Sequence, residues 1–219
     1  MTSFAPWDIL RFGQKTFFPE GFPAHPHRGF ATLTYCLQGG MIHRDSMGVK
    51  QSYGAEKRHK GRTAQWLTAG AGMLHEEMWD VGPDDNKWPL SFLQPSSQEL
   101  YQIWVNLPSR DKMLDPTVKL MRVGLEGRSH SKDDVTVANM PSVTVDGTET
   151  IVVLGSYRGM KSDIVTSTPL DVLHIRMSPG STWSHEFPDG DTGILYIRQG
   201  SVQVGKGTFV ECHHTAYLR

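Results

Sequence analysis

Residues 30–37 run Phe30-Ala31-Thr32-Leu33-Thr34-Tyr35-Cys36-Leu37. Leu33, Tyr35 and Leu37 lie two residues apart, so an extended chain places all three on one face. Apolar side chains at this spacing, together with threonine and tyrosine, are typical of a β-strand. We therefore predict a strand over residues 30–37.

Five more segments have the same character: 101–107, 117–123, 150–154, 171–177 and 194–198. Turn-forming residues such as glycine, proline and aspartate separate these segments from one another. No long segment shows the period of 3.6 residues that an amphipathic helix requires. Short strands at this spacing predict an all-β fold, either a sandwich or a barrel.

Composition and charge exclude several classes of protein. The 219 residues include 22 Lys+Arg and 23 Asp+Glu, a net charge of −1, so no positive field is available for direct binding of nucleic acid. There is no apolar run long enough for a membrane helix, and residues 1–6 do not resemble a secretory signal. Cys36 and Cys212 are expected to be reduced thiols. These features predict a cytoplasmic or nuclear protein without membrane contact.

Two short motifs bring together side chains that can bind metals. The imidazoles of His25-Pro26-His27 are two residues apart, so a strand turns both to one face. The side chains of His75 and Glu77 share a face in the same way within His75-Glu76-Glu77. Each motif alone also has an explanation without a metal. The first could be a turn with two surface histidines, and the second could be the solvated end of an acidic strand.

The two motifs together favour a metal site. A barrel makes neighbours of strands that are distant in sequence, so the two pairs can converge on one ion. Three imidazoles and one carboxylate suit iron, manganese, nickel, copper or zinc. On an octahedral ion these four ligands leave two positions open, whereas a closed tetrahedral zinc site would be structural. The residues by themselves leave both cases open.

Three stretches of the chain resemble the pirin family of bicupins: His25–Phe30 (HPHRGF), Gln65–Met78 (QWLTAGAGMLHEEM) and Gln102–Leu107 (QIWVNL). The resemblance implies cupin barrels, each a double-stranded β-helix or jelly roll. It also implies one divalent metal ion, iron, held by His25, His27, His75 and Glu77. One departure is Ala31, which stands where the family usually has glutamate.

The expected domain organisation rests on this resemblance and on a weak internal repeat. Tyr35–Gly39 (YCLQG) and Tyr196–Gly200 (YIRQG) each follow an Asp-hydrophobic-Leu triplet at a similar spacing. We expect an N-terminal metal-binding cupin at 1–108, a linker or bridging strands at 109–145, and a metal-free C-terminal cupin at 146–219. The second copy lacks the ligand set, which predicts that it binds no metal. Because the sequence stops 19 residues after Gly200, we also predict a bicupin whose second barrel is incomplete and truncated.

The resemblance implies an oxidoreductase, a quercetinase that uses O₂ to cleave a flavonol as quercetin 2,3-dioxygenase does. The metal would lower the pKa of the substrate's hydroxyl group, and Glu77 is the candidate catalytic base. Some family members instead serve as iron-dependent nuclear cofactors that bind a transcription-factor complex, which is the alternative function. A third alternative is a non-functional truncated paralogue.

Two further groups of residues have weaker predictions. His43-Arg44-Asp45 is expected to begin a strand, with His43 at most close to the metal pocket. Four tryptophans are expected in the core or at its rim, where an aromatic wall would suit a flavonoid: Trp66, Trp79, Trp88 and Trp104.

Overall fold

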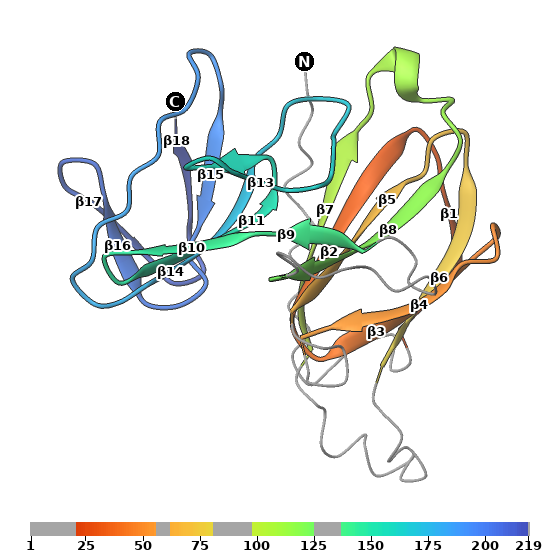
Figure 1. Ribbon diagram of the computed structural model, residues 1–219, viewed down its shortest axis with the longest axis horizontal. Coiled ribbons are helices and arrows are strands. Elements are labelled where there is room, and N and C mark those ends of the chain that lie inside the picture. Colours follow the sequence, from red (N-terminus) through yellow and green to blue (C-terminus); the bar gives the residue numbers. More distant parts are fainter. Residues whose placement is uncertain (1–20, 56–61, 81–97, 125–136, 219) are drawn as a thin grey trace, which may run out of the picture. The chain divides into compact units, whose positions relative to one another are not determined.

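The computed structural model describes residues 21–55, 62–80, 98–124 and 137–218 (Figure 1). Strands dominate these residues, and the only helix within them is a single 3₁₀ turn, η3 (Ser109–Asp111). The chain divides into two compact units, Met1–Ser181 and Thr182–Arg219. In the described ranges, no helix has the length and apolar character needed to cross a membrane.

The first sheet holds both histidine motifs. Its strand order is β1-β6-β3-β4, and all neighbours are antiparallel. The strands are β1 (Gly21–His27), β6 (Met73–Trp79), β3 (Gly40–Asp45) and β4 (Lys50–Gly54). β6 is therefore an inner strand, with β1 on one side and β3 on the other.

A second, five-stranded sheet has the order β7-β2-β5-β8-β9. Its strands are β7 (Glu99–Asn106), β2 (Phe30–Gln38), β5 (Thr63–Thr68), β8 (Thr117–Val123) and β9 (Ala138–Met140). Gln102 of β7 hydrogen-bonds to Glu77 of β6, so the two sheets face each other at this point. A small apolar cluster of Cys36, Met41, Tyr53 and Leu100 joins both sheets.

A third sheet, β10-β11-β14, completes the described part of the first unit together with a small hairpin, β12-β13. These strands are β10 (Ser142–Val145), β11 (Thr148–Leu154), β14 (Val172–Met177), β12 (Ser156–Tyr157) and β13 (Met160–Lys161). The largest apolar core includes Leu33 and Trp66 from the second sheet and Ile151 and Leu154 from β11. Burial of these side chains holds the second and third sheets together.

The second unit contains two antiparallel pairs. β15 (Gly193–Tyr196) pairs with β18 (Thr215–Leu218), and β16 (Ser201–Val204) pairs with β17 (Thr208–Glu211). Both cysteines of the chain are free thiols, Cys36 buried in the first unit and Cys212 exposed in the second.

The prediction of an all-β fold is confirmed, and each of the six predicted segments overlaps one observed strand: β2, β7, β8, β11, β14 and β15. One prediction was wrong: His43-Arg44-Asp45 ends β3 rather than beginning a strand, because the turn follows Asp45. The domain boundaries at 108 and 145 remain a prediction. The first triplet of the proposed repeat, residues 8–10, lies outside the described residues.

Gly21 allows β1 to lie close to β6. Its φ of +126° is a left-handed conformation that favours glycine, and an added Cβ would collide with the backbone of Glu77 and Met78. Gly48 has a φ of +85°, but an added Cβ there meets no atom within 4 Å.

We expect Gly21→Ala to lower the free energy of unfolding by more than Gly48→Ala. Gly48→Ala is the control, and it should lower the free energy of unfolding only by the cost of a left-handed alanine, about 1–2 kcal/mol. Gly21→Ala must in addition push β1 away from β6. Urea unfolding of both variants measures the difference. Equal losses would show that the close approach at Gly21 does not matter.

Candidate metal centre

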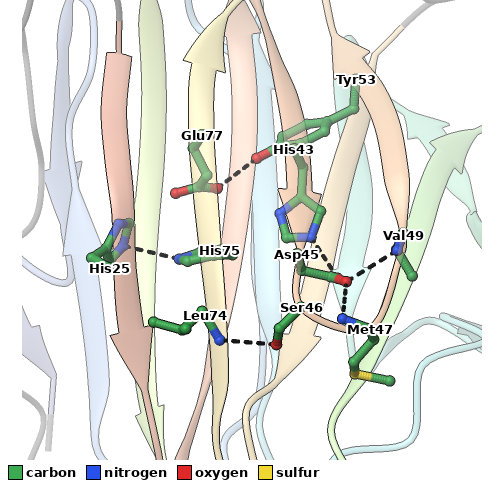
Figure 2. A network of polar contacts seen from close by, with 10 residues as sticks. All are labelled: His25, His43, Asp45, Ser46, Met47, Val49, Tyr53, Leu74, His75 and Glu77. Atoms are coloured by element: carbon green, nitrogen blue, oxygen red, sulfur yellow. Dashed lines mark hydrogen bonds and ion pairs between the residues drawn. The ribbon is translucent and has the colours of Figure 1, made fainter.

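Strand register brings the two predicted motifs into direct contact. β1 and β6 are paired so that His25 lies opposite His75, and β3 and β6 are paired so that His43 lies opposite Glu77. Directly opposed residues of antiparallel strands point to the same face. His75 and Glu77 share that face because they are two residues apart (Figure 2).

Three imidazoles meet at one point. His25 Nε2 lies 3.1 Å from His27 Nε2 and 2.9 Å from His75 Nε2. The ligand atoms of all three residues lie within 4.8 Å of one another. His27 and His75 are buried, and His25 is half-buried.

A backbone contact fixes the orientation of His25. Its Nδ1 lies 2.8 Å from the carbonyl oxygen of Pro23. A carbonyl only accepts hydrogen bonds, so Nδ1 carries the proton, and in the neutral ring Nε2 presents a lone pair to the other two histidines. Histidines that bind metals are commonly held by such a contact at the second ring nitrogen.

Coordination of a metal ion explains the arrangement of these residues better than hydrogen bonds among the three histidines do. The single lone pair on His25 Nε2 cannot satisfy two neighbouring imidazoles, and His75 Nδ1 is buried without a hydrogen-bond partner in the described residues. Metal–nitrogen bonds of about 2.1 Å at right angles would separate neighbouring nitrogens by about 3.0 Å. The observed separations of 2.9 and 3.1 Å match this spacing.

Glu77 lies beside the three histidines and is held by two donors. Its side chain is buried; the hydroxyl of Tyr53 donates to Oε1 at 2.8 Å, and Gln102 Nε2 donates to Oε2 at 2.9 Å. Trp104 Nε1 donates to the amide oxygen of Gln102 at 3.2 Å, which turns the amide NH₂ toward Glu77. Glu77 also forms a second group of potential ligands with His43 and His75.

Aromatic rings border the histidine cluster on one side. His27 packs edge-on against Phe30 and Trp104, with ring centroids 4.8 and 5.4 Å away. Phe30 and Trp104 stack on each other at 4.8 Å, and Trp104 is 39 % exposed. A partly exposed aromatic side chain, Trp104, therefore lies next to the candidate metal ligands.

Comparison with known proteins identifies the family. A family model described as Pirin matches residues 3–105. The chain is 36% identical to human pirin over 211 residues and 34% identical to a pirin-like protein of Solanum lycopersicum over 206 residues, each match covering 91% of the chain. The match to the family model places residues 3–105 in the pirin family. The chain spans 59% and 58% of the length of these two relatives.

Solved structures confirm the cupin fold expected for a family member. Quercetin 2,3-dioxygenase from Acinetobacter baumannii matches with a TM-score of 0.68 and 29% identity, over 91% of this chain and 60% of that one. The GK1651 protein of Geobacillus kaustophilus matches with a TM-score of 0.67 and 25% identity, over 99% of this chain and 82% of that one.

Sequence patterns pointed to some of the candidate site residues and missed others. His25, His27 and His75 come together, and Glu77 lies in the neighbouring group. Gln102 and Tyr53 were missed, because their contact with Glu77 depends on how the strands pack. His43 was undervalued, although His43 and Asp45 have the same two-residue spacing that singled out the other motifs.

Burial keeps the central histidines neutral. Desolvation, reinforced by the neighbouring imidazole of His25, lowers the pKa of His27 from 6.5 to about 4. Desolvation and then the charges of the surrounding histidines lower the pKa of His75 to about 3. Burial also raises the pKa of the Tyr53 hydroxyl well above its ordinary value, so it remains a donor to Glu77. Neutral imidazoles are the form that binds metals.

We expect the metal-free protein to lose stability on acidification. Below the ordinary histidine pKa of 6.5, the unfolded chain binds more protons than the folded chain, because burial lowers the pKa of His27 to about 4. The contribution of His27 to the free energy of unfolding is therefore complete above pH 6.5 and is lost as the pH falls toward about 4. Urea unfolding in the presence of a chelator, at about pH 7.5 and about pH 5, measures the loss. His27→Asn should show a smaller pH dependence, and an unchanged dependence would contradict the account.

Proposed function

We propose that this chain is an iron-dependent cupin that oxidises a flavonol with O₂, in the manner of a quercetin 2,3-dioxygenase. The observation that carries the proposal is the meeting of three histidine Nε2 atoms beside a buried carboxylate. The likeness to the Acinetobacter baumannii enzyme supports the reaction class. The residues that would hold the ion are His25, His27, His75 and Glu77.

Iron bound by these residues would supply a Lewis acid that lowers the pKa of the substrate's hydroxyl group. The role of Glu77 in this proposal is to accept the proton of that hydroxyl group. Tyr53 and Gln102 each donate one hydrogen bond to its carboxylate, which leaves a further lone pair on each oxygen. The two donors fix the position of the carboxylate, and positioning of this kind favours proton transfer.

The aromatic residues at the border of the site support a flavonol as the proposed substrate. A flavonol is planar and aromatic, and the exposed ring of Trp104 offers a face on which it can stack. The same tryptophan holds Gln102, which in turn holds Glu77. Trp104 therefore combines two roles in the proposal, binding the substrate and positioning the base.

We expect iron-loaded protein to consume O₂ when quercetin is added, as measured with an oxygen electrode. Glu77→Gln should lower the rate by about 10²- to 10⁴-fold, the usual contribution of a general base. Trp104→Ala should raise KM by about 2- to 10-fold, because one aromatic contact contributes about 0.5–1.5 kcal/mol. Glu211→Gln, an exposed glutamate on β17, serves as the matched control and should behave as wild type.

Protein with confirmed iron that consumes no O₂ with quercetin would contradict the proposed activity. The alternative, an iron-dependent cofactor that binds a transcription-factor complex in the nucleus, would then be the function to test.

A further inference from the structure

A fully buried histidine next to the three-histidine cluster, His43, has no hydrogen-bond partner among the described residues on one side of its ring. Neither His43 nor Asp45 has any exposed side-chain surface, and His43 Nε2 lies 2.9 Å from Asp45 Oδ2. The other ring nitrogen, Nδ1, is buried and has no hydrogen-bond partner among the described residues. A buried polar atom without a partner is costly, so its position calls for an explanation.

Asp45 determines which nitrogen of His43 carries the proton. Its Oδ1 accepts hydrogen bonds from the backbone N–H groups of Met47 at 2.8 Å and Val49 at 3.0 Å. This turn fixes the carboxylate, and Oδ2 accepts a hydrogen bond from the N–H group at His43 Nε2 (Figure 2). In the neutral ring, Nδ1 then has a free lone pair.

That lone pair belongs to a second group of ligand atoms. Nitrogen or oxygen atoms of His43, His75 and Glu77 all lie within 4.8 Å of one another, and all three residues are buried. The rings of His43 and His75 are 5.3 Å apart. Each partner is itself oriented: Asp45 holds His43, and Tyr53 and Gln102 hold Glu77. Such outer contacts are typical of residues that bind metal ions.

We propose that His43 is a further metal ligand, which forms with His75 and Glu77 a second ligand set beside the three-histidine set, with His75 common to both. The inference rests on the metal site of the proposed function and extends it. Two histidines and one carboxylate are the ligands typical of non-haem Fe(II) sites, whereas three imidazoles also suit zinc and copper. Asp45 is a positioning residue, because it acts on the ion only through His43.

The test is binding of Co(II) alone to the metal-free, full-length chain, followed by visible absorption and without any substrate. His43→Gln keeps a side-chain N–H that can donate to Asp45 but removes the imidazole lone pair. Asp45→Asn keeps an oxygen for the backbone of Met47 and Val49 but removes the acceptor for His43. His174→Gln is the matched control, since His174 contacts Tyr35 and belongs to neither ligand set.

We expect His43→Gln and Asp45→Asn each to weaken Co(II) binding by about 10- to 100-fold and to change the visible spectrum, with His174→Gln like wild type. Thermal unfolding of the metal-free proteins establishes whether each variant is folded. If His43→Gln is not folded, the result for Asp45→Asn decides the test. Unchanged affinity and spectrum in the folded variants would overturn the role of His43 alone. Failure of the wild type to bind Co(II) would overturn the metal site as well.

Discussion

The placement of β6 between β1 and β3 is the constraint on which the rest of the site depends. Because His25 is paired with His75, and His43 with Glu77, the side chains of three strands converge on one face. A shift of register by one residue would turn His75 and Glu77 to the opposite face and separate all the candidate ligands. The close approach of β1 to β6 at Gly21 and the core around Met41 and Tyr53 hold this register in place.

The strands and most of the candidate ligands followed from local patterns in the sequence. Period-two spacing predicted β2 from residues 30–37, and it predicted that His25 and His27 share a face, as do His75 and Glu77. These inferences succeed because alternation along a strand is a local property. The resemblance to pirins then assigned both pairs to one ion.

Side-chain contacts between strands could not be predicted from such patterns. Nothing near Gln102 or Tyr53 in the sequence indicates that both donate hydrogen bonds to Glu77, because the contacts come from the packing of β7 and β4 against β6. His43 and Asp45 did have the informative spacing, but their position at the end of β3 was misjudged. Knowledge of the turn after Asp45, which its own carboxylate stabilises, would have corrected the prediction.

The central claim is that a single ion is bound at His75, the residue that both ligand groups share. Anomalous X-ray diffraction at the iron absorption edge, from crystals of iron-loaded protein, tests this claim most directly. The account predicts one strong peak at bonding distance from a His75 ring nitrogen, about 2.1 Å. A peak elsewhere, or no peak in crystals whose protein contains iron, would contradict it.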